Sequence, residues 1–244
     1  MSEQDQPNTS FLPMPRVHPD WITVGVLLAV FFLWLEPAQP FYRQFLLSDS
    51  RLQHPFAEHE RVTDNELYFL SAIVPTLIIA FFSLKTSSDT KGAKYHLLGL
   101  WVSLAVNGCI TDLLKNWIGN PRPDFLDRCT PSKGTPIDSY VLINVCTAPR
   151  GPSSIIDGMK STPSGHSSIG FSGLFYLSLW AWQWARAQKK EIKYASFLLV
   201  AAPTMLATYI ALSRVQDYRH HFFDVFFGSA LGIAAASLSW LKYQ

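Results

Sequence analysis

Six blocks of mainly apolar residues, each about long enough to cross a lipid bilayer as a helix, divide this chain of 244 residues. Hydrophobic residues make up 48% of the chain and charged residues only 16%, a smaller charged share than soluble proteins usually have. A soluble helical protein would spread its apolar residues in shorter periodic runs. The pattern predicts an all-α fold, an integral membrane bundle of six transmembrane helices. The blocks cover roughly residues 20–42, 66–84, 96–118, 165–186, 193–212 and 221–241.

We expect two parts in the chain, a polar N-terminal tail at 1–19 and one six-span domain at 20–244. The first apolar block follows about twenty mostly polar residues. The sequence EPAQPF then stands where a signal peptide would need small residues for cleavage. We therefore expect the first block to remain in the protein as its first span.

Lysine and arginine residues in the short loops predict the orientation, because cytosolic loops carry an excess of both. Loop 85–95 holds three lysines, and loop 186–193 holds one arginine and three lysines. With six spans, these two loops share a side with both termini, and we expect that side to be cytosolic. Loops 119–164 and 213–220 then face the lumen or the cell exterior. The NTS sequon at Asn8 would lie on the cytosolic side and stay unmodified.

Three polar groups of residues stand at the ends of these blocks, where polar side chains are expensive and usually mark function. They are KNWIGNPRP at 115–123, PSGH at 163–166 and SRVQDYRHHFFD at 213–224. Each group lies between an odd-numbered block and the even-numbered block that follows. All such junctions lie on one face of a six-span bundle, so hydropathy alone predicts a single site.

The cations of these groups suit a phosphate. Guanidinium groups, as in Arg122 and Arg214, bind phosphate oxygens with paired hydrogen bonds, and Lys115 adds a point charge. Ser164 is expected to cap the fourth helix, and Gly165 permits close approach of a bound group to the positive helix start. Alone, each residue would be an interfacial anchor or a plain cap. Together they describe a phosphate cradle.

Two histidines accompany this cradle. His220 and Asp224 are four residues apart, so one helical turn would stack them. A carboxylate hydrogen-bonded to one ring nitrogen fixes the tautomer and makes the other nitrogen a better nucleophile. His166, on another block, would protonate a leaving oxygen as general acid. The sequence therefore predicts phosphoryl transfer with His220 as the attacking group.

The motifs K-x6-RP, PSGH and SR-x5-H-x3-D, in this order, resemble the signatures of the type 2 phosphatidic acid phosphatase (PAP2) superfamily. The likeness covers roughly residues 60–240. It implies that His220 takes the phosphoryl group, that Asp224 orients it, and that His166 protonates the leaving group and then activates water. It also implies that no divalent metal or other cofactor is needed. The residues that the resemblance assigns to the phosphoryl oxygens are Lys115, Arg122, Ser164, Gly165 and Arg214.

Stretches 53–63, 115–129 and 213–225 also resemble fungal diacylglycerol pyrophosphate phosphatases. The likeness implies hydrolysis of diacylglycerol pyrophosphate to phosphatidate and of phosphatidate to diacylglycerol, in a vacuolar or other endomembrane. Lysophosphatidate, a sphingoid-base phosphate and a polyisoprenyl pyrophosphate stay open as substrates. A lipid-phosphate binder without turnover is the rival from another class, although binding alone needs no nucleophile. With a net charge of +2, no patch points to nucleic acid.

Cys129 and Cys146 lie in the loop predicted to be non-cytosolic, where disulfides persist. A bond between them is one hypothesis, and two free thiols are the other. Asp112 is expected to pair with Lys115 rather than to tune the site. The loop 124–162, of roughly forty residues, is long enough to cap the site.

Two other polar sets carry weaker interpretations. Asp217 and Arg219 would shape substrate access or pair with each other. The second set lies between the first and second apolar blocks and is expected to belong to a solvated loop rather than to a metal site. Its members are His54, Glu58, His59 and Glu60.

Overall fold

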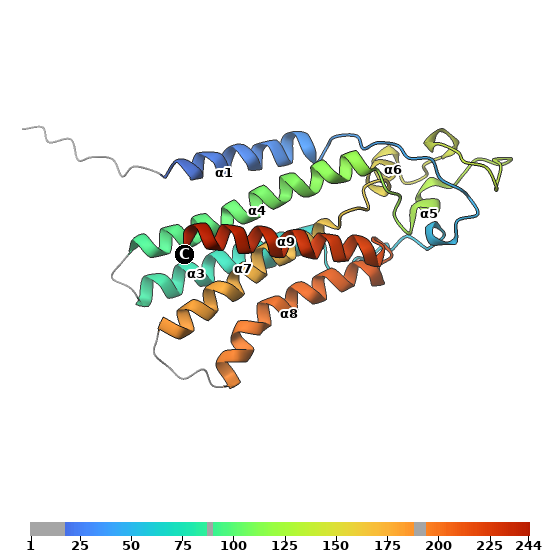
Figure 1. Cartoon of the computed structure of the whole chain (residues 1–244). Coiled ribbons are helices and arrows are strands. Elements are labelled where there is room, and N and C mark those ends of the chain that lie inside the picture. The colour runs from blue at the N-terminus through green and yellow to red at the C-terminus, as the bar shows by residue number, and fades with distance from the viewer. Residues whose placement is uncertain (1–17, 87–89, 188–193) are drawn as a thin grey trace, which may run out of the picture.

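The computed structural model describes residues 18–86, 90–187 and 194–244, and these residues are all-helical with no β-strand (Figure 1). This confirms the predicted all-α class. Most of the predicted polar tail and its Asn8 sequon lie outside the described residues. So do the three lysines of loop 186–193.

Six long helical segments in the described chain match the six apolar blocks. Pro19–Val30 (α1) continues in a π-helical turn, Phe31–Leu35. The first block was predicted to reach residue 42, but the helix ends earlier because prolines at 37 and 40 cannot continue it. The other segments are Asp64–Tyr68 (α2) running through Phe69–Ile73 into Val74–Thr86 (α3), Thr90–Ile118 (α4), Gly165–Ala187 (α7), Tyr194–Gln216 (α8) and Phe222–Tyr243 (α9).

Three described segments are long and apolar enough to cross a membrane, namely Asp64–Ser83, Gly92–Ile118 and Phe222–Tyr243. Pro19–Leu35 is apolar but shorter. Buried serines on α7 lower the hydropathy of that helix. An apolar helical bundle is therefore confirmed, whereas the number of six spans stays a prediction.

Helix α7 lies at the centre of the bundle and packs against α4, α8 and α9. Small residues allow the closest approach: a Cβ atom at Gly232 of α9 would collide with the backbone oxygen of Ser168 on α7. Ser103 on α4 exchanges a hydrogen bond of 2.7 Å with Ser172 on α7. Close backbone approach and hydrogen bonds between hydroxyl groups stabilise helix packing in a membrane, where burial of apolar surface gives little driving force. They fix the start of α9 beside the start of α7, where two of the polar motifs lie.

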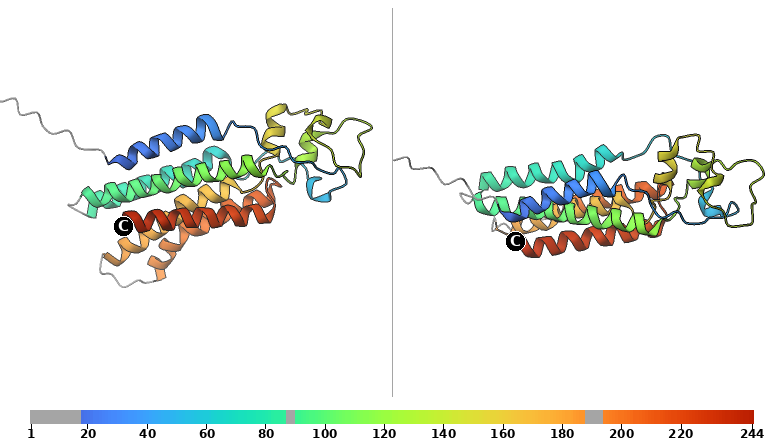
Figure 2. Two further views of the ribbon diagram at one scale, coloured as in Figure 1. Left: turned by 45° about the horizontal axis from the view of Figure 1, so that its top comes forward. Right: turned by 90° about the horizontal axis from the view of Figure 1, so that it is seen from above.

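A cap covers one end of the bundle, whereas α1 begins and α9 ends at the other (Figure 2). It combines the chain after α1 with the long α4–α7 connection. That connection contains Phe125–Cys129 (α5), the 3₁₀ turn Ile143–Val145 and Pro152–Gly158 (α6). The cap has its own apolar core, made of Phe45, Leu52, Phe125, Cys129, Ile155 and Met159. A disulfide joins Cys129 to Cys146, so the hypothesis of a bond is confirmed over that of free thiols.

Replacing Cys146 by serine is expected to destabilise the cap. The bond closes a loop between residues 17 apart in sequence, and losing that constraint costs about 3 kcal/mol on the chain-entropy account. The midpoint of thermal inactivation in detergent should fall, while Cys109→Ser, which alters the unpaired cysteine, leaves it near the wild-type value. An unchanged midpoint in Cys146→Ser would contradict this role for the bond.

Candidate active site

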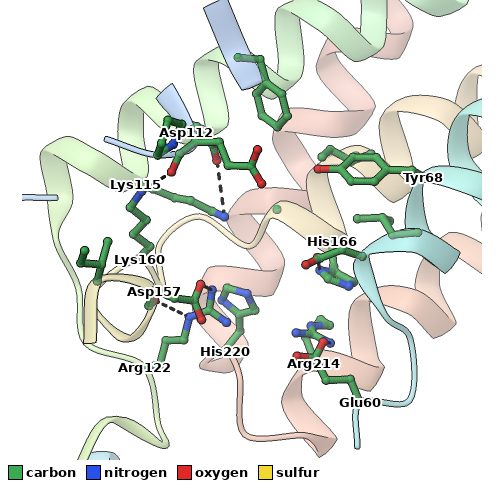
Figure 3. Close-up of a pocket in the computed structure, with 18 of the residues that line it drawn as sticks. Glu60, Tyr68, Asp112, Lys115, Arg122, Asp157, Lys160, His166, Arg214 and His220 are labelled. Atoms are coloured by element: carbon green, nitrogen blue, oxygen red, sulfur yellow. Dashed lines mark hydrogen bonds and ion pairs between the residues drawn. The ribbon is translucent and has the colours of Figure 1, made fainter. Parts of the chain in front are cut away.

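The three polar motifs meet in one cavity of about 400 Å³ at the capped end of the bundle (Figure 3). Lys115 comes from the last turn of α4, Arg214 from the last turn of α8, and His166 from the first turn of α7. Arg122 and His220 come from the connections that follow α4 and α8. The predicted convergence on one face of the bundle is thus present. The motif residues that line the cavity are Lys115, Arg122, Gly165, His166, Arg214 and His220.

Each motif cation is held by a carboxylate. Arg122 Nη2 donates to Asp157 Oδ1 at 2.6 Å, and Arg214 Nη1 donates to Glu60 Oε2 at 2.8 Å. Lys115 Nζ lies 3.5 Å from Asp112 Oδ1, as predicted for that pair. Asp157, from α6, and Glu60, from the chain before α2, are distant from the motif cations in sequence.

Asp157 ties the cap to the cradle. It lies in α6 and binds both Arg122 and Arg128, the latter at 2.8 Å. Burial alone would raise the pKa of Asp157, but the two guanidinium groups hold it well below its usual range. The carboxylate therefore stays charged and keeps Arg122 in place before any substrate arrives. No motif marked Asp157 in the sequence.

His220 is oriented differently from the prediction. Its Nδ1 lies 2.7 Å from the backbone oxygen of Ser161 but 4.0 Å from Asp224 Oδ2, too far for a hydrogen bond. The four-residue spacing does not stack the pair, because α9 begins at Phe222 and His220 precedes it. A carbonyl only accepts, so Nδ1 carries the proton and Nε2 keeps its lone pair.

Asp224 acts on His220 through the neighbouring chain. Its carboxylate accepts hydrogen bonds from the hydroxyl groups of Ser161 and Thr162 and, at 2.9 Å, from the backbone amide of His221. It therefore fixes the segment whose carbonyl holds the imidazole. Sequence reasoning missed Ser161, which bonds both Asp224 and His220.

Burial lowers the pKa of His220 well below its ordinary value, and the positive charges of Arg122 and Arg214 lower it further. The side chain is 2% exposed. The ring is consequently neutral at neutral pH, and the lone pair of Nε2 is free.

His166 is the second buried imidazole of the cavity. Its Nε2 donates to the backbone oxygen of Val62 at 3.0 Å, which leaves Nδ1 available for proton transfer. Nδ1 lies 3.8 Å from Asp64 Oδ1, at the start of α2. The two histidines therefore present different ring nitrogens, Nε2 of His220 and Nδ1 of His166.

Ser164 and Gly165 serve the start of α7. Ser164 Oγ accepts from the amide of Ser167 at 3.4 Å, which is the predicted cap interaction. Ser164 is fully buried and is not among the residues that line the cavity, so its hydroxyl supports the helix start. A Cβ atom at Gly165 would lie 3.0 Å from Lys115 Nζ, so glycine leaves room for that ammonium group.

Gly165→Ala is expected to lower kcat/KM for phosphate release about 10- to 100-fold, because the new methyl group displaces Lys115 from the cavity. The long Lys115 side chain can move, so the protein should remain folded. Gly25→Ala is the matched control, since nothing lies within 4 Å of a Cβ atom there. Unchanged kinetics in Gly165→Ala would exclude this close approach from the working site.

The weaker interpretations need two corrections, at the Asp217–Arg219 pair and at Glu60. Asp217 and Arg219 do not pair with each other: Asp217 binds Arg61, and Arg219 lies 2.6 Å from Glu60. Glu60 is therefore part of an ion-pair network with Arg214 rather than of a solvated loop. The described residues bring together no group of three or more His, Cys, Asp or Glu side chains suited to a metal.

Comparison with known proteins identifies the family. The profile of the PAP2 superfamily matches residues 96–244. Diacylglycerol pyrophosphate phosphatase 1 of Saccharomyces cerevisiae is 38% identical over 237 residues, which cover 93% of this chain and 81% of that protein. Probable diacylglycerol pyrophosphate phosphatase 1 of Schizosaccharomyces pombe is 34% identical over 221 residues, 91% and 79% of the two chains.

The likeness extends beyond fungi. Lipid phosphate phosphatase 2 of Arabidopsis thaliana is 33% identical over 233 residues, 92% of this chain and 76% of the plant protein. No solved structure matches the chain at comparable significance. The match over most of the chain, together with the three motifs around one cavity, shows that this protein belongs to the PAP2 superfamily.

Proposed function

We propose that this PAP2-type hydrolase removes the terminal phosphate of diacylglycerol pyrophosphate to give phosphatidate, and that of phosphatidate to give diacylglycerol. The observation that carries the proposal is a buried, neutral His220 whose Nε2 is left free in a cavity lined by three motif cations. A binder of lipid phosphates would need the cations but not this prepared imidazole. The names of the fungal relatives support the choice of lipid.

In the proposed first step, His220 Nε2 attacks the terminal phosphorus, and the bond from phosphorus to the leaving oxygen breaks. His166 enters this step as an imidazolium, with one proton on Nε2 against Val62 and a second on Nδ1, and it donates the Nδ1 proton to the leaving oxygen. In the second step, water attacks the phosphohistidine, His166 takes the proton of that water, and inorganic phosphate leaves. Both steps are general acid–base and nucleophilic catalysis by residues of this cavity.

Lys115, Arg122 and Arg214 would neutralise the charge on the transferring phosphoryl oxygens. In phosphoryl transfer, positioning and charge stabilisation supply most of the catalysis. Their carboxylate partners keep these cations in place, so little rearrangement is needed when substrate binds. We propose that no metal ion takes part in the reaction.

We further propose that residues 20–244 form a six-span domain in a vacuolar or other endomembrane, with cytosolic termini and a site that faces the lumen. Large apolar side chains exposed on the outer face of α9, such as Phe226, Leu238 and Leu241, suit contact with acyl chains. The cavity lies at one end of the bundle, which suits a phosphate at head-group depth. The lysine-rich loops support the orientation.

The test is phosphate release in detergent micelles that contain EDTA. Diacylglycerol pyrophosphate, phosphatidate and a soluble phosphate monoester would be compared at equal bulk concentration. Release from both lipids in EDTA, with little from the soluble monoester, is the expected result. If the folded protein binds the lipids but releases no phosphate, the proposed function is wrong and the protein is a lipid-phosphate binder.

A further inference from the structure

A fourth cation lines the cavity outside the three motifs. Lys160 follows α6, and its side chain is directed toward the end of the cavity where Lys115 and Asp112 lie (Figure 3). The residue is only 8% exposed. Sequence reasoning gave it no role, because it precedes the PSGH motif by a few residues and belongs to no pattern.

Lys160 differs from the motif cations in its partners. Among the described residues, no carboxylate oxygen forms an ion pair with Lys160 within 4 Å, whereas each motif cation has one. The Lys160 ammonium donates one hydrogen bond, to the backbone oxygen of Glu36 at 2.7 Å. An ammonium group has three donors, so two are left for another acceptor.

The absence of an ion-pair partner makes burial of the Lys160 ammonium group unfavourable. A buried cation without a paired anion is costly, because burial removes its hydration and no opposite charge compensates. Burial lowers the pKa of Lys160, and the more distant charges of Asp112, Asp157 and Glu36 oppose this shift without forming an ion pair. A bound anion at this end of the cavity would remove that cost.

The backbone fixes Lys160 relative to the proposed nucleophile. Its amide donates to the backbone oxygen of Asp157 at 3.0 Å, and Asp157 holds Arg122. The next residue, Ser161, holds His220 through its carbonyl. These bonds fix the backbone of Lys160 beside the cradle, and the hydrogen bond to the backbone oxygen of Glu36 holds its ammonium group.

We propose that Lys160 binds the second phosphoryl group of a diphosphate substrate, the group that stays on the lipid when the terminal one moves to His220. The inference rests on the proposed function and adds that the second phosphoryl group is what the site recognises in its substrate. The bond between His220 Nε2 and the terminal phosphorus forms, and the bond from that phosphorus to the bridging oxygen breaks. The bridging oxygen leaves as part of phosphatidate, whose phosphate stays at Lys160. When phosphatidate is hydrolysed, the leaving group is a neutral alcohol, which gives Lys160 no phosphate to bind. Lys160 should therefore raise the rate for the diphosphate more than the rate for phosphatidate.

The test compares two substrates in one variant. In Lys160→Met, kcat/KM for diacylglycerol pyrophosphate should fall about 10- to 100-fold, the effect of one lost charge-assisted hydrogen bond, while the value for phosphatidate changes less than about threefold. Lys160→Arg should restore most of the preference. Lys133→Met, which alters an exposed cap lysine, is the matched control and should leave both values unchanged.

A second measurement does not depend on turnover. Calorimetric titration of the detergent-solubilised protein should show tighter binding of inorganic pyrophosphate than of inorganic phosphate, and Lys160→Met should remove that difference. If Lys160→Met lowers the rates for both lipids equally, the residue only anchors the chain at Glu36, and the inference is overturned. If wild type releases phosphate from neither lipid, the proposed function fails, and the pyrophosphate titration alone decides the role of Lys160.

Discussion

Replacing His220 by alanine is expected to lower phosphate release from both lipids by at least about 10⁴-fold, the scale on which enzymes lose rate when their nucleophile is removed. The imidazole supplies the attacking atom, and no other described side chain of the cavity is oriented by Ser161 in this way. Initial rates in micelles with EDTA are the measurement, with circular dichroism to show that the helices persist. His59→Ala, which alters an exposed histidine of the cap, is the control and should keep wild-type rates.

A variant at His220 that kept more than about one hundredth of the rate would not fit a nucleophile, because losses of that size are typical of a single supporting hydrogen bond. The cavity would then have to activate water directly. His166 would be the remaining base for that reaction, and the three cations would keep their role.

Arg214→Lys is expected to lower kcat about 10²- to 10³-fold, the second largest effect. The guanidinium group is 2% exposed and donates from Nη1 to both Glu60 and the backbone oxygen of Val62, which leaves the rest of its planar fork for phosphate. A lysine keeps the charge but not the paired donors. Steady-state kinetics with saturating lipid measure the change.

The fold around this substitution should persist. The backbone oxygen of Arg214 accepts from the amides of Arg219 and His220, and these bonds do not depend on the side chain. Arg186→Lys is the matched control, because Arg186 is exposed in the last turn of α7 and far from the cap in sequence and structure. Wild-type kcat in Arg214→Lys would remove the guanidinium group from the reaction.

The helical body of the protein could be predicted from the sequence. A long apolar block in a membrane folds as a helix, because a helix forms all of its backbone hydrogen bonds within itself. The cap could not be predicted. Its core joins Phe45 to Phe125 across distant segments, and its short helices carry no periodic pattern long enough to recognise. The disulfide could be named as a hypothesis because only two cysteines share that loop.

The candidate site divides in the same way. The motif residues could be placed in one cavity because successive spans alternate in direction. The third-to-fourth and fifth-to-sixth junctions, which hold all three motifs, therefore lie on one face. The supporting contacts come from the cap: Ser161 holds His220, Asp157 holds Arg122, and Glu60 holds Arg214. The cap brings together residues that are far apart in sequence, so no motif spacing could have indicated these contacts. The Asp224 contact was misjudged because helical spacing was applied to a residue that precedes the helix.

The carboxylate partners give the site a property that the motifs alone do not suggest. Three cations gathered around one small cavity repel one another, and paired carboxylates offset this repulsion while substrate is absent. The phosphate then meets donors that are already oriented, which is the condition for strong electrostatic stabilisation of a transition state. Lys160 stands apart because its ammonium group forms no ion pair with a described carboxylate, and in our proposal the substrate supplies the counter-charge.

The central claim is the covalent phosphohistidine at His220, and rapid acid-free quenching with diacylglycerol pyrophosphate labelled in its terminal phosphate tests it most directly. The account predicts label bound to the protein that is stable to alkali and lost in acid, present in wild type and absent from His220→Ala. Steady phosphate release by wild type with no bound label at any quench time, or equal labelling of His220→Ala, would contradict it.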